Sequence, residues 1–322
     1  MTEFIDFSDA LRRSEASRRA LLVGNGFSAR YFNYATLLDQ SGLMIGSPLR
    51  NVFDRLRTKD FELVIRALEG AIAVEDSYGH YDHAHQLADD AQCVREALVK
   101  AVYATHPAHR REIETSYTSS AAFLRHFSTV FSLNYDLLLY WANFENELFT
   151  DGFGLGDKVG PFIASFSDQA YFSLYNLHGG LHLFDDGFGV VKKAIDGGRG
   201  VVDTIADTII NYDELPIYVA EGTSAKKMRK INSVAYLRHC YDKLKRNDKT
   251  MFVFGHSADD NDAHIYRAIF ASEARHLYFG VYKPDDEKLL WLDGQLARFQ
   301  RFAGSSIGYT FFDSESAKVW DS

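Results

Sequence analysis

The sequence predicts an α/β protein with a Rossmann-like parallel sheet, helices on both faces of that sheet and one helical insertion. Short apolar segments alternate with stretches in which apolar residues recur at helical spacing. Several of these segments, such as 250–254, are apolar on both sides, as strands are when helices cover both faces of a parallel sheet. Polar or glycine-rich residues follow four of these segments directly, as ligand-binding loops do in this class of fold.

The composition is typical of a globular protein with one large core. The chain has 322 residues, of which 46% are hydrophobic and 25% charged. A net charge of −9 argues against broad binding to nucleic acid, which requires a basic face. Cys93 and Cys240 lie far apart, so we expect reduced thiols and no four-cysteine zinc site.

No targeting or membrane segment is expected. The first residues, MTEFIDFSDALRR, are acidic and mixed, unlike a signal peptide. No run of about 18 apolar residues occurs in the sequence. We therefore expect a cytoplasmic protein without a membrane partner.

The first strand is predicted over 18–23, and it ends in the glycine turn Gly24–Gly26. A helical pattern follows as far as Leu37 and Leu38. Residues 51–115 carry two long stretches of helical spacing and are predicted to be a helical insertion. A Rossmann-type nucleotide-binding domain then comprises residues 1–50 and 116–322.

The second part of the chain alternates strands and helices. Strands are predicted at 127–133, 171–177, 216–220, 250–254, 276–281 and 309–312. Helices are predicted at 137–147, 226–245, 261–271 and 286–302. The glycine-rich stretch 152–160 is expected to be a loop, and 186–203 an excursion rich in Gly and Asp.

Four predicted strands end in short motifs that carry chemistry. They are GNGFS (24–28), NYD (134–136), HGG (178–180) and GHS (255–257). Because ligands of open parallel sheets bind where the carboxyl ends of the strands gather, these motifs predict one shared site.

The glycine turn suits a diphosphate. Gly24 and Gly26 permit close backbone approach, and a helix beginning after the turn would direct amides at the anion. The segment lacks the third glycine of GxGxxG, so a tight turn without a ligand is the alternative.

Three further motifs have candidate roles and simpler alternatives. Asn134 can hydrogen-bond ribose hydroxyls, whereas Asp136 can instead cap the following helix. His178 is a candidate general base, with His182 as its rival. The acidic run 259–262 after Ser257 can bind ribose hydroxyls or a metal, or begin a solvated helix.

The order of these motifs resembles the sirtuin-like superfamily, where GAGxS, QNxD, a catalytic HG and GTS follow one another. The strings FSLNYDLLLYW, NLHGGLHLF and FGHSADDNDAHI resemble bacterial sirtuin-like families of uncharacterised or antiviral-defence proteins. The resemblance covers 20–30, 127–145, 171–184 and 250–270, and elsewhere only the topology.

The departures from the sirtuin pattern are informative. Sirtuin deacylases carry a zinc ribbon of four cysteines, which two cysteines cannot form. Leu133 stands in place of the glutamine, and Asn25 in place of the alanine. The resemblance therefore implies the NAD-handling part of the machinery, and not peptide deacylation.

What the resemblance implies is an NAD+ glycohydrolase (NADase) that releases nicotinamide and ADP-ribose, acting as a regulated NAD-depleting effector in bacterial antiviral defence. Asn134, Asp136 and His178 are the implied catalytic residues. The implied NAD-binding residues are Gly24, Asn25, Gly26, Phe27, Ser28, Gly255, His256 and Ser257. NAD is the substrate, and no metal is expected.

Constitutive hydrolysis would deplete a cell of NAD, so we expect control by homo-oligomerisation or a regulatory protein, with the insertion as the interface. Three alternatives remain open. One is a non-catalytic sensor of NAD or ADP-ribose, and another is a zinc-free deacylase. The third is a metal-dependent hydrolase that uses His80, His83 and His85.

Overall fold

The fold is that of a computed structural model. The structure describes residues 3–32, 37–153, 158–163, 166–167, 172–185, 191–195, 200–212, 214–219 and 222–320. The statements below concern these residues.

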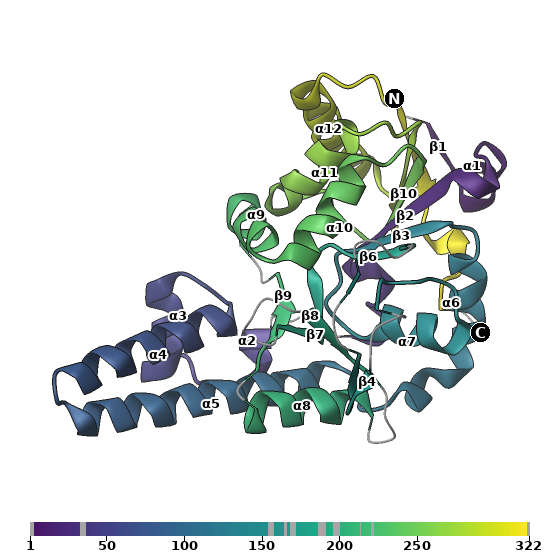
Figure 1. Ribbon diagram of the computed structural model, residues 1–322. Helices are drawn as coiled ribbons and strands as arrows, with labels where there is room; N and C mark the ends of the chain where they lie inside the picture. Colours follow the sequence, from purple (N-terminus) through teal and green to yellow (C-terminus); the bar gives the residue numbers. More distant parts are fainter. Residues whose placement is uncertain are drawn as a thin grey trace.

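A seven-stranded parallel sheet forms the centre of the molecule (Figure 1). Its order is β1-β12-β11-β10-β2-β3-β6, and every neighbouring pair is parallel. The strands are β1 (Phe4–Asp6), β2 (Arg19–Val23), β3 (Thr129–Ser132), β6 (Leu174–Asn176), β10 (Thr250–Phe254), β11 (Leu277–Val281) and β12 (Tyr309–Asp313). The predicted Rossmann-like fold is confirmed.

Six of these strands follow the doubly wound order. Counted along the chain from β2, the order across the sheet is 3-2-1-4-5-6, and β1 is added beside β12. The connection reverses direction between β2 and β10, which pair from Arg19–Thr250 to Val23–Phe254. Ligands of such sheets bind outside the carboxyl ends of the strands at this switch point.

Helices cover both faces of the parallel sheet. Side chains of β2 alternate, so Leu21 and Val23 face one hydrophobic core while Ala20 and Leu22 face the other. The first core includes α1 (Phe7–Arg12), α6 (Tyr117–Leu124) and α7 (Leu138–Asn146). The second includes α10 (Ala235–Lys245), α11 (Ala263–Phe270) and α12 (Asp286–Ala303).

A second, five-stranded antiparallel sheet was not predicted. Its order is β4-β5-β8-β7-β9, with the strands β4 (Lys158–Val159), β5 (Phe162–Ile163), β7 (Gly179–Asp185), β8 (Val191–Ala194) and β9 (Pro216–Tyr218). The strand predicted at 216–220 therefore pairs with β7, outside the parallel sheet. The predicted loop at 152–160 contains β4, and the predicted excursion contains β8 and the start of α8 (Val201–Asn211).

Most of the stretch predicted as an insertion is helical. It contains most of α3 (Pro48–Leu56), α4 (Phe61–Ser77), α5 (Tyr81–Thr105) and part of the 3-10 segment η3 (Arg110–Ser116). Figure 1 shows α4 and α5 extending together away from the parallel sheet, with α3 above them. Leu98 and Val102 of α5 join the first hydrophobic core.

Two predicted helices differ from those observed. The continuous helix expected after the glycine turn is wrong: only the 3-10 segment η2 (Asn25–Phe27) follows the turn, and α2 (Leu37–Gln40) begins later. Residues 33–36 between them lie outside the described residues. The helix expected over 226–245 is divided at Val234 into α9 (Ser224–Ser233) and α10.

Three shorter 3-10 segments complete the elements: η1 (Ala16–Arg18), η4 (Asp260–Asp262) and η5 (Glu315–Ala317). None of the helices in the described part of the chain combines the length and the apolar character that crossing a bilayer requires.

Candidate functional site

The switch point is built from backbone. The amide of Gly24 donates to the carbonyl of Phe254 (2.9 Å), and that of Gly26 donates to the carbonyl of Gly255 (2.7 Å). A Cβ on Gly26 would lie 2.6 Å from Gly255 Cα, and Gly255 itself has a φ of +72°. Glycine is needed at these positions because the loops after β2 and β10 touch without side chains between them.

Two cavities meet at this junction. The first, here called the His178 cleft, has a volume of about 890 Å³ and is lined by Asn25, Tyr135 and His178 among others. The second, here called the Trp291 pocket, has a volume of about 670 Å³ and includes Gly26 and Trp291 in its lining. Gly255, His256 and Ser257 line both cavities.

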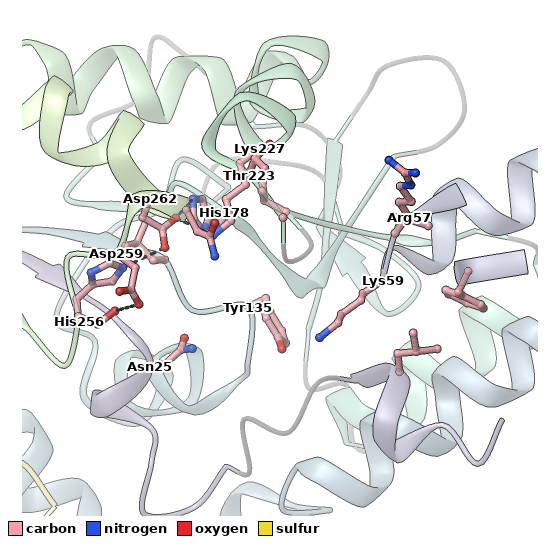
Figure 2. A pocket seen from close by; sticks show the side chains of 18 of the residues that line it. Asn25, Arg57, Lys59, Tyr135, His178, Thr223, Lys227, His256, Asp259 and Asp262 are labelled. Atoms are coloured by element: carbon pink, nitrogen blue, oxygen red, sulfur yellow. Dashed lines mark hydrogen bonds and ion pairs between the residues drawn. The ribbon is translucent and has the colours of Figure 1, made fainter. Parts of the chain in front are cut away.

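The His178 cleft has walls of different origin (Figure 2). His178, Thr223, Lys227, His256 and Asp262 lie on one side of it, and Arg57 and Lys59 lie across from them. Arg57 and Lys59 follow α3, so the helical segment contributes part of the site. Figure 2 shows Tyr135 between the two sides, with Asn25 on the side of His256 and Asp259.

His178 lies where the chain leaves the parallel sheet. It follows β6 and precedes β7, and the next residue, Gly179, has a φ of +71°. A Cβ at Gly179 would lie 2.1 Å from the carbonyl oxygen of Ile217. Gly179 therefore lets the chain turn sharply from one sheet into the other and fixes the imidazole of His178 at the cleft.

Two histidines and a carboxylate converge at the cleft. His178 Nε2 lies 3.3 Å from His264 Nε2 and 3.8 Å from Asp262 Oδ1. The other ring nitrogen of His264, Nδ1, lies 3.1 Å from Ser224 Oγ, which also accepts a hydrogen bond from the His264 amide (3.0 Å). The His264 ring is thereby held in one orientation.

Burial keeps both imidazoles neutral. It lowers the pKa of His178 well below its usual value, a shift that the Asp262 charge opposes and the Lys227 charge reinforces. Burial likewise lowers the pKa of His264 to about 4. Each ring therefore carries one lone pair at neutral pH, and in the 3.3 Å contact between the two Nε2 atoms one ring donates a hydrogen bond to the other.

Asp262 stays ionised. Burial acts to raise its pKa, but the hydrogen bond from His256 and the neighbouring positive charge of Lys227 outweigh that effect and the pKa is lowered. Lys227 Nζ lies 2.7 Å from Oδ1, and His256 Nε2 lies 3.3 Å from Oδ2. Because His256 Nδ1 accepts a hydrogen bond from the Ala258 amide (3.0 Å), His256 Nε2 carries the ring proton and donates a hydrogen bond to Asp262.

Asn134 does not line either cavity in the described structure. Its side chain is 3% exposed, and Nδ2 donates to Ser28 Oγ, which is fully buried (3.0 Å). Its Oδ1 has no hydrogen-bond partner in the described structure. Asn134 therefore connects the end of β3 to the loop after β2, beneath the surface of the site.

Asp136 binds the first turn of α7 but is not the N-cap that the sequence suggested, because the N-cap of α7 is Leu137. Its side chain is buried, and Oδ1 accepts a hydrogen bond from the Leu138 amide (2.8 Å) at the start of α7. It lines neither cavity among the described residues.

The other predicted residues divide between lining and support. Asn25, His256 and Ser257 line the His178 cleft. The ring of Phe27 is fully buried and packs against Trp320, with ring centroids 5.0 Å apart, so it supports the turn from below.

The other histidines that the sequence offered as candidates lie outside the His178 cleft. His182 is buried on β7 and stacks on Tyr140, with ring centroids 4.8 Å apart. His80 and His83 gather around Glu75 on the surface between α4 and α5, and His85 is not part of that group.

Sequence reasoning missed four residues of the site: Ser224, Lys227, His264 and Tyr135. His264 is in the string FGHSADDNDAHI, two residues after the acidic run. An i to i+2 spacing of Asp262 and His264 at a helix start was the available signal. Ser224 and Lys227 gave none, because their approach depends on how α9 packs against α11.

No curated protein matches this chain. One family model matches residues 21–320, which is nearly the whole chain and includes both cavities. The chain therefore belongs to the family described as a domain of unknown function, DUF4917.

Proposed function

We propose that the chain binds NAD+ across the switch point and hydrolyses its nicotinamide–ribose bond. The observation that carries this proposal is the pair of cavities that meet at the backbone contact of Gly26 and Gly255, with His178 on one side. A dinucleotide matches this arrangement, because its two nucleosides would occupy the two cavities and its diphosphate would lie at the contact between them. The resemblance of the four motifs to sirtuin-like proteins supports the same reading.

The Trp291 pocket suits the adenosine half. It lies at the carboxyl ends of β10, β11 and β12 and is lined by the aromatic rings of Tyr282 and Trp291. Aromatic faces and a cationic Lys288 nearby are suited to a purine and its phosphate. The His178 cleft then receives the nicotinamide ribose.

The reaction needs a water, a base and a site that stabilises positive charge. The water oxygen forms a bond to C1′ of the ribose, and the C1′–N bond breaks with its electron pair passing to the pyridine nitrogen. Nicotinamide leaves neutral, so no general acid is required. The water loses one proton, which the neutral imidazole of His178 accepts.

The charges near His178 fit this role. The ionised Asp262 carboxylate, 3.8 Å from His178 Nε2, stabilises the imidazolium that forms and the positive charge that develops on the ribose. Asn134 acts through Ser28 in this scheme and is a positioning residue, and Asp136 holds α7 in place.

The expected biological role is that of a regulated NAD-depleting effector in bacterial antiviral defence. It rests on the resemblance of the three longer sequence strings. Regulation by self-association or by a protein partner follows from the cost of uncontrolled NAD loss.

Chromatographic analysis of products after incubation with NAD+ tests the proposal. Wild type should release nicotinamide and ADP-ribose, and His178→Ala should lower the rate by at least about 100-fold. His85→Ala, which removes an exposed histidine of α5, is the matched control and should leave the rate unchanged. Equal rates for wild type and His178→Ala would refute the assignment of His178.

A sensor that binds NAD without cleaving it is the second candidate. The buried positions of Asn134 and Asp136 favour it, because two of the three predicted catalytic residues do not reach the cleft. Calorimetric binding of NAD+ without nicotinamide release, with and without self-association, would support the sensor and refute the hydrolase.

A further inference from the structure

The cluster of His178, Asp262 and His264 has the geometry of a metal site, and we propose that it binds a divalent transition-metal ion such as Zn²⁺. The three ligand atoms come from the turn after β6, from η4 and from α11, and all lie within 4.8 Å of one another. Two imidazoles and one carboxylate are a common ligand set for Zn²⁺ and for other first-row metals.

The distances match those around a bound ion. Ligands at about 2.1 Å from a tetrahedral Zn²⁺ lie about 3.4 Å from one another. The two Nε2 atoms are 3.3 Å apart, and His178 Nε2 is 3.8 Å from Asp262 Oδ1. The third side of the triangle, between His264 and Asp262, is at most 4.8 Å, so these two ligands would close by up to about 1.4 Å to reach the tetrahedral spacing.

Neighbouring side chains orient the three ligands by hydrogen bonds, as they do around metal ions in other proteins. Ser224 Oγ lies against Nδ1 of His264, which leaves Nε2 to face the other ligands. His256 holds Oδ2 of Asp262 and leaves Oδ1 directed at His178. His178 and Asp262 also line the cleft, so a fourth ligand, water or a substrate oxygen, can approach from there.

Lys227 takes the place of the cation when no metal is bound. Its Nζ lies 2.7 Å from Asp262 Oδ1, the oxygen that would ligate the ion. Entry of a metal must displace this ammonium group, and the two cations therefore compete for one carboxylate.

The test is a titration with Co²⁺, followed by its visible absorption, and with Zn²⁺, followed by calorimetry. A background of His80→Ala with His83→Ala removes the exposed cluster at Glu75, which offers the other metal-binding group found in the described residues. We expect one Co²⁺ per chain in this background, with the strong visible bands of a tetrahedral site. His264→Gln should weaken binding by more than about 100-fold, and Ser224→Ala by about 10-fold.

Lys227→Met should tighten binding several-fold, because it removes the competing ammonium group. This variant keeps the proposal falsifiable if His264→Gln fails to fold, as judged by circular dichroism. Absence of saturable Co²⁺ binding in the background protein, or affinity unchanged by both His264→Gln and Lys227→Met, would overturn the site.

A consequence for catalysis rests on the proposed function. A bound ion occupies the Nε2 lone pair of His178, so Zn²⁺ should inhibit nicotinamide release, and a chelator should restore it. Metal binding without any NAD cleavage would refute the hydrolase and leave the metal site standing. NAD cleavage without metal binding would refute the metal site and leave the hydrolase standing.

Discussion

At the scale of single residues, three buried histidines have lowered pKa values but lie in different surroundings. His178, His182 and His264 are each 4% exposed, and burial lowers the pKa of all three. Only His178 lies on the cleft, whereas His182 stacks on Tyr140 beside the ion pair of Asp151 and Lys193. Equal burial thus accompanies a position on the cleft in one case and a packed position in the other.

His182 should make the fold sensitive to acid. Burial, reinforced by Lys193, lowers its pKa to about 3, below the 6.5 expected in the unfolded chain. As the pH falls below 6.5, the unfolded state takes up a proton that the folded state does not, so the free energy of unfolding decreases until the folded pKa is reached. At pH 5 this one group costs about 2 kcal/mol relative to pH 8.

His182→Phe retains an aromatic ring against Tyr140 and removes the titration. Urea unfolding at pH 8 and pH 5 should therefore show a smaller loss of stability for the variant than for wild type, by about 2 kcal/mol. An identical loss in both proteins would contradict the assigned protonation behaviour of His182.

At the scale of elements, the sequence predicted where the strands of the parallel sheet end, but it did not predict the strand pairing of the second sheet. The motifs at residues 24, 134, 178 and 255 follow β2, β3, β6 and β10, as the apolar runs before them predicted. Each such run is a local pattern. The second sheet escaped prediction because β7 and β9 pair across a long stretch of chain, and because the two-residue strands β4 and β5 leave no periodicity to detect.

The candidate site could be predicted to a similar extent. His178, Asn25 and His256 reach the cleft as expected. Asn134 and Asp136 do not, because a polar residue after a strand can turn inward to Ser28 or bind the first turn of a helix, and the sequence does not distinguish these outcomes from exposure. His264 and Lys227 depend on the packing of helices that are remote from β6 in sequence.

The glycine junction gives a prediction at this scale. In Gly26→Ala the new Cβ would lie 2.6 Å from Gly255 Cα, so the loops after β2 and β10 must separate. We expect a loss of about 1–3 kcal/mol in stability. We also expect at least about 10-fold weaker NAD+ binding by calorimetry, since a shift at the junction misplaces the diphosphate.

Gly294→Ala is the matched control. Gly294 lies within α12, and a Cβ added there would meet no other element of the protein within 4 Å, so alanine should raise helix stability by up to about 1 kcal/mol. Its NAD+ affinity should equal that of wild type. Equal affinity in Gly26→Ala as well would show that the junction does not contact the ligand.

At the scale of the whole molecule, the parallel sheet and the helical segment contribute to one cleft. The sheet supplies His178 and His256, and the residues after α3 supply Arg57 and Lys59 from the other side (Figure 2). Lys226 Nζ donates to the Arg57 carbonyl (2.7 Å), and Lys230 of α9 pairs with Glu62 of α4. Movement of the helical segment would therefore change the width of the cleft.

The same helical segment exposes apolar and aromatic side chains. Val74 is 55% exposed, Tyr78 77% and Tyr81 63%, all around the connection between α4 and α5. Regulation by self-association predicts that this end of the segment is buried between copies of the chain. Light scattering after size exclusion should show an oligomer for wild type and a smaller species for Val74→Glu combined with Tyr78→Glu.

In the proposed regulation, self-association acts on activity through the width of the cleft. If contacts at the connection between α4 and α5 fix the position of α3, the dissociated variant should lose nicotinamide release. Its circular dichroism should stay that of wild type, because the substitutions are on the surface. Its Co²⁺ affinity should also be unchanged, because the proposed metal ligands do not belong to the helical segment. Leu290→Glu with Phe302→Glu on α12 alters two equally exposed apolar residues and should change neither mass nor rate. A monomeric wild type with full activity would separate the helical segment from regulation and leave it only the role of a wall of the cleft.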